Sequence, residues 1–363
     1  MRKNFHVPEN YFLSHSVGCL PKVTEAALTS DFLGPWKSGA SWADWMPVLD
    51  RFRHGMAQIM DVTAAEICPQ INVSSALTKI LHSLPPSSSR NQILLSKQDF
   101  PTIGFVVKQA ELAGFELCFV EGDVLDAQRW GDAITDRTAF VHVTHSLSNT
   151  SHLLPVAEIC VLAKQAGAKS VIDAAQSTGI VPVTPKDWGA DFVIGTGVKF
   201  LCFGPGACFL YAAKEILPDC NPVDVGWFSH ENPFEMDITQ FRFAANAMRF
   251  FGGTPSPAPL VAANAAIEVW SGLEAKTLHA RIRENLDTLC EAVPDEALVS
   301  PKHPIARGGT CVVNPADRTL LRNNLKAADI LHDERTEGFR FSVHAYTPLS
   351  DCTKLASVFK ASL

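Results

Sequence analysis

Between residues 69 and 212 the sequence alternates short, mostly apolar runs with longer segments of helical periodicity. Runs such as 92–95, 139–143 and 170–173 have the length of strands, and a segment such as 155–168 is long enough for a helix. Strands that read as continuous apolar runs are buried on both faces, as in a parallel sheet. The pattern therefore predicts an α/β fold with a mostly parallel central sheet sandwiched by helices.

The alternation stops near residue 259, and the rest of the chain has a different character. A helical stretch over 260–293 is followed by mixed strand and helix signals, and a chain of 363 residues is long for one compact core. We expect four parts: a loop-rich N-terminal segment that packs on the functional site (1–45), a large α/β domain (46–260), a connecting long helix (261–295) and a second, smaller α+β domain (296–363).

Charge and composition narrow the possible partners. The net charge of −7 argues against nucleic acid or an anionic membrane as a partner. No run approaches the roughly eighteen apolar residues of a membrane helix, and the first residues lack the apolar core of a signal peptide. We therefore expect a cytoplasmic protein that works on a small molecule.

The metal-binding residue types are scattered. The ten cysteines include no Cys-x-x-Cys pair, which argues against a zinc site and a disulfide framework and fits a reducing compartment. The spacing of His142, His145 and His152 follows strand alternation and a loop, without an acidic partner. We expect no metal site.

Two charged side chains stand at the ends of apolar strands, where a charge is costly unless it is used. Lys199 follows the strand 192–195 through a glycine-bracketed turn, and Asp173 ends the strand 169–173. Because sites in such sheets form at the carboxyl ends of strands, we expect the two groups to meet. Pyridoxal phosphate needs a lysine for its Schiff base and a carboxylate for its pyridinium nitrogen. Alone, each residue reads more simply as a solvent-exposed lysine or a helix cap; together they favour the cofactor.

The other requirements of this cofactor also have candidates. Val73, Ser74 and Ser75 lie between a strand and a helix, where backbone amides can bind a phosphate. A plain serine N-cap is an equally good reading of that segment. Phe100 offers a flat face for the pyridine ring, although a phenylalanine before a helix is more often a core residue.

Several segments together resemble class V of the fold type I pyridoxal-phosphate-dependent enzymes, and within that class kynureninase. The likeness includes Asp-x-x-Gln at 173–176 and runs nearly end to end. Its most specific segment contains Trp227. The segments that carry the likeness are Tyr11–Lys22, Asp99–Thr102, Asp187–Phe192, Val225–Asp237 and Gly338–Thr347.

This resemblance implies a fold type I transferase-like fold, pyridoxal 5'-phosphate as cofactor and a small amino acid as substrate. It implies Lys199 as the catalytic residue and Arg340 as the ligand of the substrate α-carboxylate, a task that suits a guanidinium. It also implies a homodimer with shared active sites, in which Trp227, Thr254 and residues 36–45 serve the neighbouring subunit. The implied cofactor-binding residues are Asp173, Gln176, Ser74, Ser75, Phe100, Trp227, Thr254 and Val73.

The chain departs from the kynureninase pattern at polar positions. Val198 stands where kynureninases have a tyrosine beside the lysine, and Gln176 stands where they have a histidine. Thr254 replaces an asparagine, Ile103 an aspartate and His15 an asparagine. Because polar sites discriminate through such hydrogen bonds, the identity of the substrate stays open.

Three functions are therefore open. The first is kynureninase-like hydrolytic Cβ–Cγ cleavage, or a related β-cleavage, in which Lys199 removes the Cα proton. The second is a class V aminotransferase that moves the amino group to a keto acid. The third is a non-catalytic binding protein of the same fold, against which the intact Lys199, Asp173 and Arg340 argue. A cysteine desulfurase is not expected, because no cysteine lies between Cys311 and Cys352.

Overall fold

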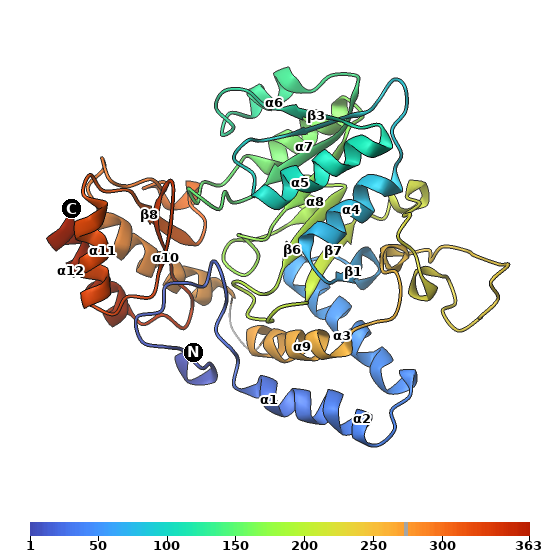
Figure 1. The fold of residues 1–363 in the computed structure, drawn as a ribbon, viewed down its shortest axis with the longest axis horizontal. Coiled ribbons are helices and arrows are strands. Elements are labelled where there is room, and N and C mark those ends of the chain that lie inside the picture. Colours follow the sequence, from blue (N-terminus) through green and yellow to red (C-terminus); the bar gives the residue numbers. More distant parts are fainter. Residues whose placement is uncertain (272–274) are drawn as a thin grey trace.

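The computed structural model describes residues 1–271 and 275–363. A seven-stranded sheet forms the centre of the larger part of the molecule (Figure 1), with strand order β1-β7-β6-β5-β4-β2-β3. Strands β2 to β6 pair in parallel, whereas β7 runs antiparallel to both β6 and β1. The strands are β1 (Ile67–Gln70), β2 (Gln92–Leu95), β3 (Glu116–Phe119), β4 (Thr138–Thr144), β5 (Lys169–Asp173), β6 (Phe192–Thr196) and β7 (Cys208–Ala212).

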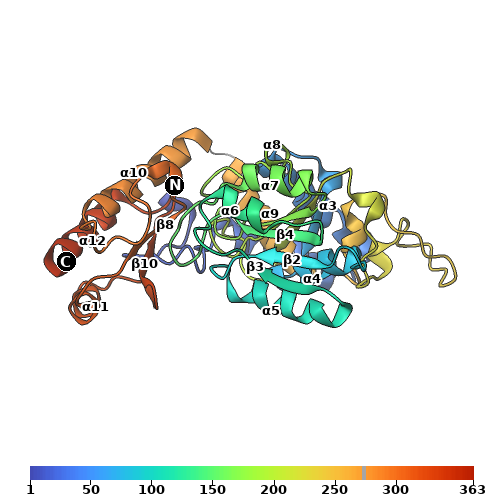
Figure 2. The same cartoon turned by 90° about the horizontal axis from the view of Figure 1, so that it is seen from above.

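Helices cover both faces of this sheet (Figure 2). Their buried side chains form one apolar cluster on each side, as expected for strands buried on both faces. One face carries α3 (Trp42–Met60), α6 (Ala127–Ala133), α7 (Val156–Gln165) and α9 (Pro257–Ser271), with α8 (Pro185–Trp188) beside α7; the other carries α4 (Val73–Ser83) and α5 (Pro101–Ala110). The predicted fold class is confirmed.

A smaller unit follows, built on an antiparallel sheet of order β8-β10-β9. Apolar residues of this sheet and of the helices beside it form a third core cluster. Its elements are α10 (Ala275–Glu291), β8 (Thr310–Val313), α11 (Arg318–Ala327), β9 (Asp333–Arg335), β10 (Gly338–Ser342) and α12 (Leu349–Ser362).

The N-terminal segment joins the two units. Its first part forms isolated bridges to the small unit, Tyr11 with Leu331 and Leu13 with Ser342. Its second part is helical where the sequence predicted loop, because apolar side chains of this stretch pack on the core beside α9. The helical pieces are α1 (Val23–Ala27), a π-helical stretch (Leu28–Leu33) and α2 (Gly34–Lys37).

The predicted long helix over 261–295 corresponds to two helices, α9 and α10. Residues 272–274, which fall inside that prediction, lie outside the described residues. Across 1–271 and 275–363, no helix is both long and apolar enough to cross a bilayer. Short 3-10 turns complete the fold at Arg2–Asn4, Ala64–Glu66, Glu111–Ala113, Leu217–Asp219, Trp227–Ser229, Ala247–Phe250 and Pro304–Ala306.

Candidate active site

A cavity of about 320 Å³ opens at the carboxyl edge of the central sheet. The ends of β4, β5 and β6 and the turns after β1 and β2 form its walls, where parallel sheets place their ligands. Six residues predicted from the sequence share this cavity: Val73, Ser74, Phe100, Asp173, Gln176 and Lys199. Their roles toward a cofactor stay predictions.

The turn that carries Lys199 is tightly packed. A Cβ on Gly197 would lie 1.9 Å from the ring of Phe203, so only glycine fits there. The N-terminal segment packs on the same turn, because the Gly18 N–H donates to the Val198 carbonyl at 2.7 Å. A Cβ on Gly18 would lie 2.1 Å from the Lys199 carbonyl oxygen. Two segments far apart in the sequence thus fix the position of the lysine.

The electrostatic surroundings of Lys199 shift its amine toward the neutral form. Burial lowers its pKa from 10.5 to about 8; Asp173 opposes this effect, and Arg340 and Arg335 add to it. A lysine with a lowered pKa is a better base and nucleophile near neutral pH than an exposed one.

Asp173 lies at the end of β5, buried at 5% exposure. It pairs in register with Thr144 on β4, and its Oδ1 accepts the Ala175 N–H at 2.8 Å. Burial raises the pKa of Asp173, while the charges of His142 and Lys199 pull it back. The carboxylate is therefore held in a dry position that favours a cationic partner.

The N-terminus of α4 points its first amides at the cavity, since Asn72, Val73 and Ser74 all line it. The N-cap is Asn72, whose side chain accepts the Ser75 N–H at 2.8 Å. The alternative reading of Ser74 or Ser75 as the cap is therefore wrong. Backbone amides at a helix N-terminus, together with the helix dipole, favour an anion, so phosphate binding here stays a prediction.

Phe100 is an exposed aromatic wall rather than a core residue, with 39% of its surface accessible. Its ring centre lies 5.8 Å from Lys199 Nζ and 5.7 Å from the guanidinium carbon of Arg335. Pyridoxal phosphate fits this arrangement. The cavity offers an amine, a buried carboxylate, an aromatic face and a helix N-terminus around one space.

The sequence predicted that Arg340 binds the α-carboxylate of the substrate, but in the structure its guanidinium already has a partner within the protein. Its side chain is 1% exposed, and Nε and Nη2 both donate to the carboxylate of Asp333 on the neighbouring strand. Nη1 donates to the Ser148 carbonyl at 2.8 Å. Burial alone would raise the pKa of Asp333, but hydrogen bonds from His15 and Arg340 outweigh it and hold that pKa well below the usual range.

Arg335, five residues before Arg340, is a second guanidinium beside the Phe100 ring and was not predicted from the sequence; neither arginine is among the residues that line the cavity. Its Nη1 donates to Asn149 Oδ1 at 2.9 Å, and about a third of its side chain is exposed. Its position over the Phe100 ring leaves it more accessible to a ligand than Arg340. The only sequence signal for it is the spacing Arg-x4-Arg, which spans the hairpin of β9 and β10.

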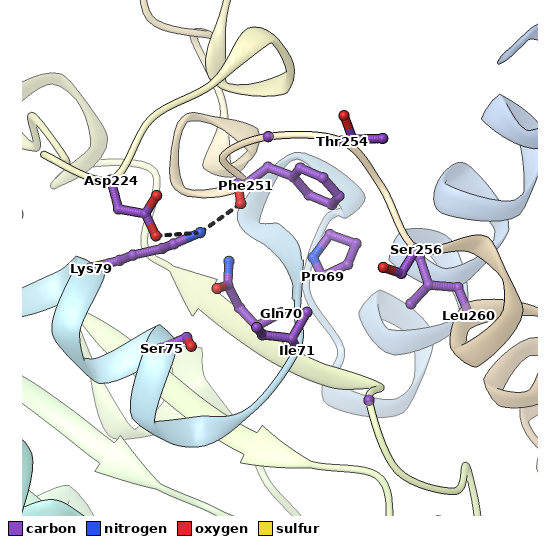
Figure 3. A pocket seen from close by; sticks show the side chains of 12 residues that line it. Pro69, Gln70, Ile71, Ser75, Lys79, Asp224, Phe251, Thr254, Ser256 and Leu260 are labelled. Atoms are coloured by element: carbon purple, nitrogen blue, oxygen red, sulfur yellow. Dashed lines mark hydrogen bonds and ion pairs between the residues drawn. The ribbon is translucent and has the colours of Figure 1, made fainter.

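Ser75 and Thr254 line a second pocket of about 220 Å³ (Figure 3), which adjoins the first because Ile71 and Gly206 line both. Lys79 is buried in its wall, where Nζ donates to the Phe250 and Phe251 carbonyls at 3.0 and 2.6 Å and lies 3.5 Å from Asp224. The lysine thereby ties the segment that leads to Thr254 onto the helix that forms the anion site.

Trp227 lines neither of these two pockets but donates its indole N–H to Thr254 Oγ1 at 3.3 Å. These two predicted residues are therefore hydrogen-bonded to each other, and neither lines the Lys199 cavity. Gln176 donates to the His15 carbonyl at 3.2 Å, which ties the cavity to the N-terminal segment. The departures Val198 and Ile103 both line the cavity with apolar side chains.

The structure also corrects the statement that the histidines of β4 lack an acidic partner. His142 Nδ1 lies 3.0 Å from Asp99 Oδ2, and the Thr144 hydroxyl donates to Asp99 Oδ1 at 2.6 Å. Asp99 directly precedes Phe100 in the chain. Only the folded strand order brings this carboxylate to β4, so local sequence spacing contained no signal for it.

Comparison with known proteins supports the resemblance. A family model for class-V aminotransferases matches residues 43–325. The chain is 31% identical to a kynureninase of Deinococcus radiodurans, covering 96% of this chain and 88% of that protein. It is 24% identical to an uncharacterized aminotransferase of Bacillus subtilis, covering 84% and 83%.

Solved structures share the fold. A cysteine desulfurase from Thermococcus onnurineus NA1 superposes with a TM-score of 0.86 at 20% identity, covering 99% of this chain and 96% of that one. The cystine C-S lyase C-DES, solved with its product cysteine persulfide, gives a TM-score of 0.84 at 22% identity, covering 98% of both chains. The resemblance predicted from the sequence is confirmed.

Proposed function

Because the chain belongs to the class-V aminotransferase family and is a pyridoxal-phosphate-dependent enzyme, we propose that it cleaves an amino acid at its β-carbon in a kynureninase-like hydrolytic reaction. The observation that carries the proposal is the Lys199 amine, with a pKa lowered to about 8, in one cavity with Asp173 and Phe100. The similarity to kynureninases over nearly the whole chain favours this reaction class.

In the proposed reaction, each residue of the cavity has a separate role toward the cofactor or the substrate. When bound, pyridoxal phosphate supplies an electron sink that makes the Cα–H of an amino acid acidic. Lys199 takes the Cα proton at Nζ, and Asp173 holds the positive charge of the ring nitrogen. The first amides of α4 bind the phosphate, and Phe100 covers one face of the ring.

We also propose that the two arginines, Arg335 and Arg340, bind the substrate α-carboxylate. Arg340 is occupied by Asp333, so a substrate carboxylate meets the more exposed Arg335 first and then lies between the two arginines. The matched variants Arg335→Lys and Arg340→Lys separate their roles. Loss of bidentate geometry at the true ligand should raise KM or the Kd of an unreactive amino acid about tenfold or more. An unchanged Kd for the amino acid in both variants would show that neither arginine binds the substrate carboxylate.

An aminotransferase is the alternative, since Lys199 and Asp173 serve both reactions and a Bacillus subtilis relative bears that name. A panel of amino acids with and without added keto acid distinguishes them. Release of alanine and an acid without a keto acid supports hydrolytic β-cleavage. Strict dependence on the keto acid would refute it. A desulfurase is disfavoured because Cys311 is buried in β8, and no further cysteine occurs before Cys352.

We also infer a homodimer with shared sites, in a reducing cytoplasm. Trp227 and Thr254 lie outside the cavity of their own chain, and the loop around them exposes apolar side chains such as Met236 and Ile238. Mixing Lys199→Ala with Thr254→Ala subunits should restore about a quarter of full activity, because hybrid dimers regain one intact site. No recovery on mixing would refute shared sites. All ten cysteines are free thiols, which supports the compartment.

A further inference from the structure

One face of the small sheet carries a carboxylate together with two guanidinium groups. Asp333 on β9 is directly opposite Arg340 on β10, so the two side chains project from the same face. Arg335 follows Asp333 by two residues on β9 and shares that face. The three charged side chains therefore lie together where the small unit contacts Phe100 and Ser148 of the larger one.

The guanidinium of Arg340 is already occupied by this carboxylate. Its Nε donates to Asp333 Oδ1 at 2.7 Å and its Nη2 donates to Oδ2, which is the two-point geometry of a bound carboxylate. The side chain of Arg340 is 1% exposed, whereas that of Asp333 is 31% exposed. The protein thus holds its own carboxylate on the arginine that we assign to the carboxylate of the substrate.

Asp333 also has partners that do not depend on Arg340. Its Oδ1 lies 3.1 Å from His15 Nε2, and its Oδ2 lies 4.0 Å from Arg335 Nε. An Asp333 carboxylate displaced from Arg340 would therefore find two partners beside it, and its partial exposure would let water complete its hydrogen bonds.

The charges of this cluster suit one more anion. Burial alone raises the pKa of Asp333, but hydrogen bonds and charges from His15 and Arg340 outweigh it, so the carboxylate is ionised at neutral pH. Burial lowers the pKa of His15 to about 4, so its imidazole is neutral there. Two guanidinium groups thus face one carboxylate, and the carboxylate of a ligand balances the second positive charge.

We propose that Asp333 is an internal competitor for the substrate carboxylate: it occupies Arg340 in the free enzyme and moves to His15 and Arg335 when a substrate takes that arginine. The proposal rests on the role proposed above for the two arginines. A tethered group competes at an effective concentration of roughly millimolar or more, so every carboxylate binds more weakly than it would to an unoccupied arginine. An amino acid tolerates this loss because the cofactor holds its amine, whereas a free acid has no second attachment. The cluster therefore keeps the site open to amino acids and nearly closed to the free acid that the proposed cleavage releases.

A purely structural role makes the opposite prediction. Asp333 would then only hold Arg340 in the orientation that receives the substrate. Its loss would weaken the binding of an amino acid and of a free acid alike. The sign of the change in affinity therefore separates the two roles.

The test measures the Kd of two probes for the holoenzyme by titration calorimetry. 2-Aminoisobutyrate is an amino acid without a Cα proton, so the proposed reaction cannot begin on it; isobutyrate is the same molecule without the amine. In Asp333→Asn both Kd values should fall about tenfold, because a charged hydrogen-bonded competitor is lost. The matched control is Glu334→Gln, since Glu334 pairs with Arg318 and Arg322 from the opposite face of the same strand. It should leave both Kd values unchanged.

A double variant separates this effect from a general gain in positive charge. Lysine cannot bind a carboxylate in the two-point geometry of arginine. In an Arg340→Lys background, Asp333→Asn should therefore lower the Kd of isobutyrate by a much smaller factor. An equal gain in that background would show that Asp333 acts only through its charge, and would overturn the exchange.

Two other outcomes distinguish this inference from the proposed carboxylate site. If both Kd values rise or stay unchanged in Asp333→Asn while Arg340→Lys weakens 2-aminoisobutyrate, Asp333 is no competitor and the role of the arginine stands. If Arg335→Lys and Arg340→Lys both leave the Kd of 2-aminoisobutyrate unchanged, the proposed carboxylate site fails, and this inference fails with it.

Should Asp333→Asn not fold, a crystal structure of the parent holoenzyme with 2-aminoisobutyrate makes the same test. The carboxylate of the probe should lie on Nε and Nη2 of Arg340, with Asp333 beside His15 and Arg335. Asp333 still paired with Arg340 in that complex would refute the exchange.

Discussion

Replacing Lys199 with methionine should stabilise the cofactor-free protein. The pKa of this lysine falls from 10.5 to about 8 on folding, because burial disfavours the charged amine. Each unit corresponds to about 1.4 kcal/mol, so folding with a charged Lys199 costs about 3 kcal/mol at pH 7. Since the folded pKa lies below the unfolded one, the cost is present in full below pH 8. It disappears as the pH rises toward 10.5.

Urea unfolding of the cofactor-free protein at pH 7 and at pH 10.5 measures this cost. Lys199→Met should raise the free energy of unfolding by about 3 kcal/mol at pH 7 and by far less at pH 10.5. Lys97→Met is the control, because Lys97 is exposed and pairs with Glu121 at the surface. Equal stability of the Lys199 variant and the parent at pH 7 would refute the reasoning. So would a stability difference that does not change with pH.

Three further outcomes follow from the geometry. Asp173→Asn should keep the fold and lower kcat about 10²–10³-fold, as steady-state kinetics would measure, because a preorganised charge is lost. Gly18→Ala should lower the unfolding free energy by about 1–3 kcal/mol and change the visible spectrum of the holoenzyme, since its Cβ overlaps the Lys199 carbonyl; Gly104→Ala, with open space around its Cβ, should do neither. Lys79→Met should cost about 2 kcal/mol in urea unfolding by leaving two carbonyls without their donor, and an unchanged midpoint would contradict that.

The sheet could be predicted from the sequence because its strands are apolar on both faces and its helices are short and periodic. The helices over 23–37 could not, since their stability comes from apolar side chains packed beside α9 rather than from local signals. Propensity is a weak guide where tertiary burial decides. The predicted helix over 261–295 falls on α9 and α10, and residues 272–274 between them lie outside the described residues, so its continuity stays a prediction.

The meeting of Lys199 and Asp173 was predictable, because both stand at the carboxyl ends of strands in one sheet. The parallel strand order brings them into one cavity. The pairs of the site were not predictable. Arg340 with Asp333, and Asp99 with His142, join residues whose proximity depends on which strands are neighbours and in which register. A sequence motif can identify a single residue, but only the folded structure shows which residue it contacts.

The absence of a phenol beside the lysine changes how protons must move. Val198 lines the cavity where kynureninases have a tyrosine, and Asp173 is the proposed partner of the cofactor's ring nitrogen. In the proposed reaction, Lys199 is thus the amine that both takes the Cα proton and returns it. At pH 7 a pKa of about 8 leaves about a tenth of the amine neutral, roughly 300-fold more than a pKa of 10.5 would. Such an amine accepts and donates protons at neutral pH without a second side chain. The burial that costs stability would therefore be what allows Lys199, in the proposed reaction, to do alone the work that kynureninases divide between a lysine and a tyrosine.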